Sequence, residues 1–414
     1  VGSEMCIRDR QKSSFLAFGC SATFILIVCM KHILLASCLL LGMGTAHAQH
    51  EVWFDEPTSL RGQQCWWGGH PEKYDKQHKP ISAGDAGSNF DPEWEYRSLP
   101  LGNGSIGCNV MGSVATERYT LNEKTLWRGG PNTAKGPQDY WNQNKQSAHL
   151  LKDIRQAFLD GDWDKAAQLT QANFNSPVPY EAWREPQFRF GSFTTLGELT
   201  LETDISEKGV KHYRRALSVD SAYAKVSFTA ENGVSYERRT FISYPANVMA
   251  VRLTASEKGK QNLTVNYTPN PLGEGTFRPD GKGGLCYVGH LDNNGMEYAV
   301  RLQVIPTKGS VTYTDGKLKV VGADAVTILL TADTDYAPNY NPDFNDAKAY
   351  VGVNPQATTK AWMKKAMKAG YNKLFAAHYK DYAALFGRVN FELDGPTSQK
   401  PTNQRLADYR KGVK

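Results

Sequence analysis

The sequence has few cysteines with which to build a disulfide scaffold or a metal site. Of the seven cysteines in 414 residues, only Cys65, Cys108 and Cys286 lie beyond residue 48. Three isolated cysteines allow at most one disulfide, and no C-x-x-C spacing occurs. The nine histidines contain no H-E-x-x-H pattern. We therefore expect neither a cysteine-stapled fold nor a metal site.

The sequence also lacks a long run of charge of one sign. Its formal net charge is +6, and acidic and basic residues are interspersed along the chain. A nucleic-acid-binding arm or a polybasic membrane patch would require clustered lysines and arginines. We therefore expect no nucleic-acid partner.

Long apolar runs are confined to the N-terminus. Met30 to Ala48 has a basic start, a short apolar segment and an A-x-A cleavage pattern, which is typical of a secretory signal peptide. We expect residues 1–29 to be an upstream artefact and the mature protein to be periplasmic or extracellular, without a membrane span. An N-terminal anchor built from residues 15–29 is an alternative, which we disfavour because the signal begins cleanly at Met30. Lipidation at Cys38 is the weaker option, since three leucines of the apolar segment still follow it.

Between residues 106 and 336 the dominant pattern is the β-strand. Runs of β-branched and aromatic residues recur between turn-forming residues, at 234–242, 248–254, 263–267, 297–305 and 325–330. Asp315-Gly316 predicts a tight hairpin within 310–321. Many strands without helices between them predict a large antiparallel β-sandwich, and one helical insert at 150–169 interrupts it.

The composition changes after residue 345. Residues 357–386 are rich in alanine and lysine with apolar residues at helical spacing, which predicts a helix ending before Gly387. A short strand at 389–393 and a Pro-containing linker follow. The expected organisation is therefore a β-sandwich over 49–345 and a helical linker over 346–414.

The segment Gly102-Asn-Gly-Ser-Ile-Gly107 has the G-x-G-x-x-G spacing of a dinucleotide-binding turn, and Glu123 lies where a ribose-binding acid is expected. Such a turn requires a helix after the third glycine. The residues that follow favour extended chain instead. We therefore interpret the glycines as a turn between strands and set the NAD-enzyme alternative aside.

From about Trp94 onward, several motifs resemble glycoside hydrolase family 95 in order and spacing. The resemblance is carried by the segments Leu99-Pro-Leu-Gly-Asn-Gly104, Leu121-Asn-Glu-Lys-Thr-Leu-Trp-Arg-Gly-Gly-Pro131, Phe193-Thr-Thr-Leu-Gly-Glu-Leu199, Tyr213-Arg-Arg-Ala-Leu-Ser-Val-Asp220 and His378-Tyr-Lys-Asp-Tyr-Ala-Ala-Leu-Phe-Gly-Arg-Val389. Members of that family are inverting 1,2-α-L-fucosidases, and some act as α-L-galactosidases.

The resemblance implies a large, supersandwich-like N-terminal β-sandwich, a helical linker and an (α/α)₆ barrel that carries the catalytic residues. The general acid Glu and the water-activating Asp of that family would lie beyond Lys414, so the catalytic barrel is absent and no catalytic residue is assigned in this chain. We expect the fragment to be inactive alone and to pack on its missing barrel. The intact enzyme would hydrolyse terminal α-L-fucosyl linkages of oligosaccharides or polysaccharides, without a metal or an organic cofactor.

The resemblance also suggests that the sandwich lends loops to the rim of the barrel pocket. Asn103, Asn122, Glu123 and Trp127 are therefore the candidate substrate-binding residues. The alternative is structural: the asparagines and Glu123 would satisfy loop backbone, and Trp127 would fill a domain interface. A stand-alone carbohydrate-binding or structural module is the alternative function for the whole chain.

Other candidate residues have a stronger structural interpretation. The carboxylate pairs Glu93 with Glu95 and Glu198 with Glu202 have strand spacings that place each pair on one face, and we expect them to be solvated surface pairs. His149 and His378 are expected to be ordinary helix residues. The Trp66-Trp67 dipeptide is either a sugar platform or a loop packed on the sandwich.

Overall fold

The computed structural model describes residues 50–58, 73–74, 80–82, 92–128, 145–174, 192–292, 294–342, 346, 348–389 and 399–412. The predicted leader, Trp66-Trp67 and nearly all of the strand predicted at 389–393 lie outside these residues. The predicted domain limits stay predictions.

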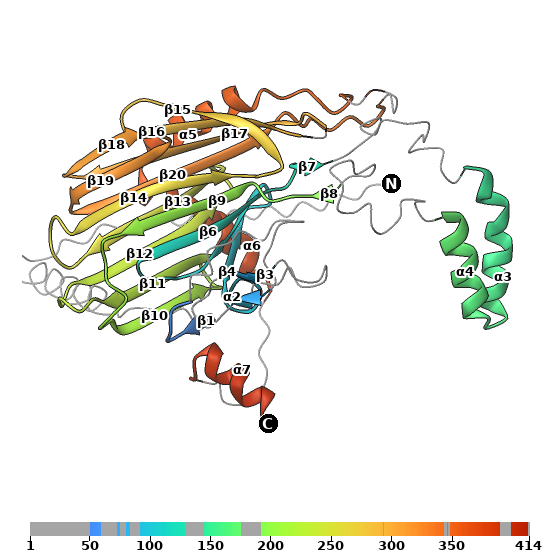
Figure 1. Ribbon diagram of the computed structural model, residues 1–414, viewed down its shortest axis with the longest axis horizontal. Helices are drawn as coiled ribbons and strands as arrows, with labels where there is room; N and C mark the ends of the chain where they lie inside the picture. Colours follow the sequence, from blue (N-terminus) through green and yellow to red (C-terminus); the bar gives the residue numbers. More distant parts are fainter. Residues whose placement is uncertain are drawn as a thin grey trace, which may run out of the picture. The chain divides into compact units, whose positions relative to one another are not determined.

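Two antiparallel sheets dominate the described residues (Figure 1). The larger, of nine strands, has the order β1 (Glu51–Phe54), β10 (Lys211–Ser218), β11 (Tyr223–Thr229), β12 (Ser235–Ser243), β13 (Val248–Ala255), β20 (Ala325–Thr334), β17 (Glu297–Thr307), β16 (Gly284–Leu291) and β15 (Gly273–Pro279). The smaller, of seven strands, has the order β18 (Ser310–Thr314), β19 (Lys317–Ala323), β14 (Gln261–Pro269), β9 (Gly197–Thr203), β6 (Thr116–Glu123), β5 (Ile106–Val110) and β4 (Leu99–Gly102). The predicted β-sandwich is confirmed.

Alternating side chains from both sheets form the main core. In β11 burial alternates residue by residue, and Val226 and Phe228 belong to the core. Val265 and Tyr267 of β14 contribute to it from the other sheet. This period of two is what a sheet requires when one of its faces packs against a second sheet.

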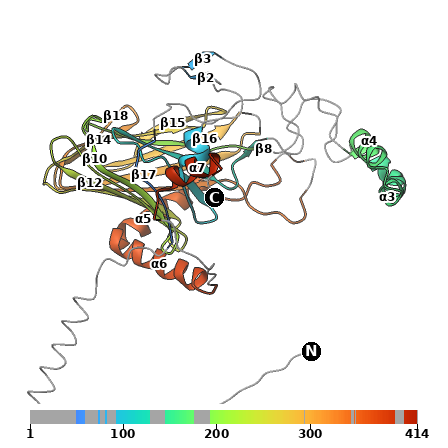
Figure 2. The ribbon, with the colours of Figure 1, turned by 90° about the horizontal axis from the view of Figure 1, so that it is seen from below.

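A smaller core lies on the other side of the nine-stranded sheet. There Phe241, Ala250 and Leu329 pack with side chains of helices α5 (Pro355–Ala369) and α6 (Tyr371–Phe386). Figure 2 shows both helices beneath this sheet. A helical segment after the sandwich is thus confirmed, but the prediction of one continuous helix is wrong. Gly370, with φ +72°, separates the two helices.

The predicted helical insert and both predicted turns are confirmed. The insert comprises the 3₁₀ helix η1 (Lys145–Leu150), α3 (Leu151–Leu159) and α4 (Trp163–Phe174). Asp315 and Gly316 have positive φ between β18 and β19, as a tight hairpin requires. Gly104, with φ +85°, lies in the turn between β4 and β5. A strand rather than a helix follows Gly107, which removes the basis of the dinucleotide-binding alternative.

Smaller elements complete the described chain. They are the helices α2 (Pro92–Arg97) and α7 (Thr402–Arg410) and the two-stranded pairs of β2 (Lys73–Tyr74) with β3 (Pro80–Ser82) and β7 (Trp127–Arg128) with β8 (Ser192–Phe193). Within the described ranges, none of the helices combines the length and the hydrophobicity needed to cross a membrane.

Candidate functional site

The predicted substrate-binding residues lie in the β4–β5 turn, at the end of β6 and on β7. Asn103 lies in the β4–β5 turn, whose Ser105 carbonyl accepts a hydrogen bond from the Lys124 N–H at 2.9 Å. Asn122 and Glu123 end β6, opposite Gly107 and Ile106 of β5. The chain therefore brings three of the four residues to one end of the seven-stranded sheet, and Trp127 follows after a short turn.

Neighbouring residues of β6 face opposite sides of the sheet, which separates Asn122 from Glu123. Leu121 belongs to the core between the sheets, and Glu123 is on the same side as Leu121 because strand side chains alternate. Asn122 is half-buried on the other side. One strand therefore cannot present both side chains to the same ligand.

The Asn103 amide is already fully hydrogen-bonded within the protein. Its Nδ2 donates to the Ser243 carbonyl at 3.0 Å and to Asn247 Oδ1 at 2.9 Å, and its Oδ1 accepts from the N–H groups of Ser105 and Ile106. These contacts fix the β4–β5 turn against the turn between β12 and β13. The structure therefore gives Asn103 a role in joining the two sheets, while its role in substrate binding stays a prediction.

Glu123 is buried beneath the turn that leads to Trp127. Its Oε2 accepts hydrogen bonds from the Thr125 N–H at 2.7 Å and from the Thr125 hydroxyl at 2.6 Å. Burial raises the pKa of the Glu123 carboxyl, the two Thr125 bonds oppose the rise, and nearby Asp333 adds to it. With a side chain only 2% exposed, Glu123 orders the turn rather than facing solvent.

Trp127 and Phe193 form an exposed aromatic pair, which we call the aromatic platform. The two residues are paired across β7 and β8, with ring centroids 5.7 Å apart and planes at 68°. Their exposed fractions are 44% and 39%. The indole N–H of Trp127 donates to the Lys124 carbonyl at 2.9 Å, which fixes the ring. Exposed aromatic faces of this kind can stack on the C–H face of a pyranose.

Strand β7, which carries Trp127, is anchored by a buried arginine. Arg128 is 4% exposed, and its Nη2 lies 3.1 Å from Oδ1 of Asp292, beyond β16. The side chain of Asn294 donates to the Trp127 carbonyl at 2.7 Å. Phe193 and Arg128 were not predicted from the sequence to be functional, because their strands have two residues each and show no periodicity.

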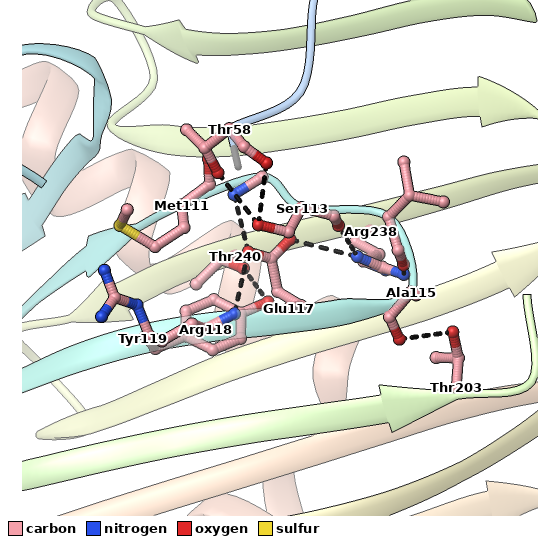
Figure 3. Close-up of polar contacts among 12 residues, drawn as sticks. Thr58, Met111, Ser113, Ala115, Glu117, Arg118, Tyr119, Thr203, Arg238 and Thr240 are labelled. Atoms are coloured by element: carbon pink, nitrogen blue, oxygen red, sulfur yellow. Dashed lines mark hydrogen bonds and ion pairs between the residues drawn. The ribbon is translucent and has the colours of Figure 1, made fainter. Parts of the chain in front are cut away.

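A separate cluster of buried charges holds the turn between β5 and β6 (Figure 3). Glu117 accepts from the N–H of Gly112 at 2.6 Å and from Nη1 of Arg238 at 3.2 Å. Arg238 also donates to the carbonyls of Ser113 and Val114. Burial raises the pKa of Glu117, and the attraction of Arg238 opposes that rise. All of these contacts are within the protein, so the cluster is structural.

The other carboxylate candidates also form internal ion pairs. The Glu93–Glu95 strand prediction is wrong, because both residues lie on helix α2; Glu93 is buried, and its Oε1 lies 3.5 Å from Arg97. Glu198 is buried on β9, 3.5 Å from Arg118, so its predicted solvation is wrong as well, whereas Glu202 is exposed.

The two histidines lie on helical elements, as expected. His149 is exposed on η1. His378 of α6 donates from Nε2 toward the Ala222 carbonyl at 3.0 Å and packs against Phe241, and burial lowers its pKa. Among the residues that the structure describes, no group of three or more His, Cys, Asp or Glu could hold a metal ion.

The family model described as "Glycosyl hydrolase family 65, N-terminal domain" matches residues 82–339 of this chain. The chain is 27% identical over 331 residues to "Alpha-L-fucosidase 2" of Arabidopsis thaliana, covering 74% of this chain and 36% of that protein. It is 30% identical over 328 residues to "Probable alpha-fucosidase A" of Aspergillus niger (strain ATCC MYA-4892 / CBS 513.88 / FGSC A1513), covering 75% of this chain and 38% of that protein. The chain thus spans little more than a third of the length of these curated relatives. A solved "Putative kojibiose phosphorylase from human microbiome" aligns with a TM-score of 0.32 at 8% identity, over 47% of this chain and 29% of its own, which is too low to carry an argument.

Proposed function

The chain belongs to the family of glycosyl hydrolase family 65 N-terminal domains, and we propose that it is the N-terminal β-sandwich region of an exported α-L-fucosidase of glycoside hydrolase family 95. The observation that carries the proposal is the alignment with two proteins named as fucosidases over about three quarters of this chain.

In this proposal the intact enzyme hydrolyses a terminal α-L-fucosyl linkage with inversion. That reaction needs a protonated carboxylic acid at the leaving oxygen and a carboxylate base on the opposite face, with the two carboxyl groups roughly 6.5–9.5 Å apart. Both groups would lie outside these 414 residues. In support, the buried Glu93, Glu117 and Glu198 are each paired with an arginine, which holds them in structural roles.

The part played by this chain would be to border the substrate pocket at its aromatic platform. Trp127 and Phe193 offer exposed rings on a strand pair that Arg128 anchors, so the rings are held in place before a ligand arrives. A fucosylated oligosaccharide or polysaccharide would pack a sugar face on these rings. The sandwich would then pack on the catalytic barrel with the platform at the rim.

Two alternatives make different predictions. The platform is also what a stand-alone carbohydrate-binding module would use, in which case these residues would bind glycans without any hydrolysis by a longer protein. The intact enzyme could instead prefer a terminal α-L-galactosyl unit, which differs from fucose in carrying a hydroxyl at C6.

The deciding experiment is to express this chain alone and in one reading frame with the coding sequence that continues it, and to assay both with matched α-L-fucosides and α-L-galactosides. We expect the longer protein to release fucose as the β-anomer, detected by proton NMR within the first minutes, and the 414-residue chain to release none. Glycan binding by a longer protein that cleaves neither substrate would favour the binding-module alternative.

Export by a cleavable signal peptide is part of the same proposal. N-terminal sequencing of the protein recovered from its native host should start at Gln49. A protein that retains Met30 to Ala48 in the membrane fraction would instead support the anchor alternative.

A further inference from the structure

A polar cavity lies at the opposite end of strand β9 from the aromatic platform. Its volume is about 430 Å³, and it is lined by residues from the β9–β10 turn, the β11–β12 turn and the start of β14. This volume falls within the range of about 300–1,000 Å³ that is usual for small-molecule sites. We call it the Asp204 cavity.

The length of β9 separates this cavity from the platform. Phe193 precedes the Gly197 end of β9, and Asp204 follows the Thr203 end. Seven extended residues span about 20 Å, so no single sugar can contact both places. The Asp204 cavity is therefore distinct from the site of the proposed function, and its ligand does not depend on that proposal.

Asp204 is held in place with one carboxylate oxygen left for a ligand. Asn262 Nδ2 donates to Asp204 Oδ2 at 3.1 Å. Asn262 is itself fixed, because its Oδ1 accepts from the Gly322 N–H at 2.8 Å. Oδ1 of Asp204 can then accept a hydrogen bond from a ligand hydroxyl at a wall of the cavity that is already ordered.

Tyr236 supplies a rigid apolar wall with a polar end. Its ring is stacked on Phe228 at 5.6 Å, and the residue is only 6% exposed. The Tyr236 hydroxyl can donate one hydrogen bond and accept others from a ligand in the cavity. Ile205 and Ala230 add further apolar surface. The cavity therefore offers a hydrogen-bond donor, an acceptor and an apolar face within one small volume.

The charges around the cavity define its ligand class. Asp204 and Glu231 disfavour an anion, and Lys260 at the same wall offsets part of their negative charge. Among the residues that the structure describes, no group of three or more His, Cys, Asp or Glu lies at this cavity. A neutral ring with several hydroxyls and an apolar C–H face satisfies every group. We propose that the Asp204 cavity is a secondary binding site for one neutral pyranose unit of a glycan.

The test is a saturation-transfer NMR titration of the full 414-residue chain with methyl α-L-fucoside, methyl β-D-galactoside and methyl α-D-glucoside as probes. The variants are Asp204→Asn, which keeps the shape but removes the charge, and Tyr236→Phe, which keeps the ring but removes the donor. Glu207→Gln, an exposed carboxylate in the same turn, is the matched control, and Trp127→Ala reports on the platform. Thermal unfolding of each variant establishes that it is folded.

We expect at least one probe to bind, and Asp204→Asn to weaken its affinity up to about tenfold, because the ligand hydroxyl then donates to a neutral amide oxygen instead of a carboxylate. Tyr236→Phe should weaken it several-fold, and Glu207→Gln should leave it unchanged. Affinity that is lost only in Trp127→Ala would overturn this site while supporting the platform. Binding unaffected by Asp204→Asn and Tyr236→Phe, or no binding of any probe up to its solubility limit, would also overturn it. The α-L-fucosidase assay of the longer protein is independent of all these outcomes.

Discussion

Glu123 and Trp127 are four residues apart, yet they have opposite relations to solvent. The Glu123 carboxyl is buried and bonded to Thr125, whereas Trp127 has 44% of its surface exposed. The family resemblance suggested the same function for both, because it placed their loop at the rim of the barrel pocket. Only the tertiary structure shows that one supports the turn while the other faces outward.

Trp127→Ala should therefore separate binding from stability. We expect a change of about 1 kcal/mol or less in the free energy of unfolding, because the ring is half-exposed. The affinity for a fucosylated oligosaccharide should fall several-fold, since stacking on the ring is lost, and Trp127→Phe should be intermediate. Urea denaturation and intrinsic fluorescence titration measure the two effects. Unaltered glycan affinity in Trp127→Ala would remove the platform from the proposal.

Substitution of Glu117 should instead lower stability strongly. Removing its carboxylate in Glu117→Ala leaves Arg238 buried without its ionic partner, and breaking such a pair costs about 3–5 kcal/mol. We expect the urea midpoint to fall accordingly. Glu207→Ala, which truncates an exposed glutamate, should leave the midpoint nearly unchanged. Equal midpoints for the two variants would contradict the assignment of the Glu117 cluster as structural.

Glu123 should also make stability depend on pH. Its pKa is raised in the folded protein, so the folded state holds the proton more tightly than the unfolded state, whose glutamate pKa is about 4.3. The stability associated with protonation is complete below that value and is lost as pH rises through the folded pKa. The stability of Glu123→Gln relative to the native protein should therefore increase as the pH rises from 4 to 7, as measured by thermal unfolding. A stability difference that is constant over this range would contradict the assigned direction.

At the scale of elements, the sequence predicted what periodicity can report. The strands β12, β13, β14, β17 and β20 and the β18–β19 turn match expectation because alternating burial and a left-handed Asp-Gly pair are local properties. The strand pair β7–β8 was missed, because two residues cannot show alternation. The contacts of Asn103 were also missed, since Ser243 and Asn247 are distant in sequence.

The break between α5 and α6 is a further element that the pattern did not reveal. Gly370 adopts φ +72° and ψ 162°, a conformation that is almost exclusive to glycine. A Cβ there would meet no atom within 4 Å, so any cost of Gly370→Ala comes from the backbone. We expect Gly370→Ala to lower the free energy of unfolding by about 1–3 kcal/mol, as measured by urea denaturation.

Gly102→Ala is the matched control for this change. A Cβ at Gly102 would meet its nearest atom at 3.5 Å, an ordinary contact, and no positive φ is required. Its effect should be clearly smaller. If the two substitutions lower the free energy of unfolding equally, the positive φ of Gly370 is not required for the break between α5 and α6.

At the scale of the whole molecule, exposed apolar residues lie near the end of α6. The outer face of the nine-stranded sheet itself is covered where α5 and α6 pack on it. Leu385 is 63% and Val389 79% exposed, and Phe386 lies between them in sequence. Apolar residues clustered in this way are typical of a surface that another domain or chain covers. In the proposed fucosidase, that partner would be the rest of the protein.

Produced alone, the 414-residue chain should therefore self-associate through this surface. We expect the mass measured by static light scattering to rise with protein concentration, and the combined change Leu385→Lys with Val389→Lys to reduce that rise, because exposed charge opposes apolar association. Lys364→Gln, on the exposed side of α5, is the matched control and should leave association unchanged. Persistence of association in the double variant would place the contact elsewhere. A monodisperse monomer at all concentrations would show that the end of α6 needs no covering partner, and would weaken the proposal that the sandwich packs on a catalytic barrel through this surface.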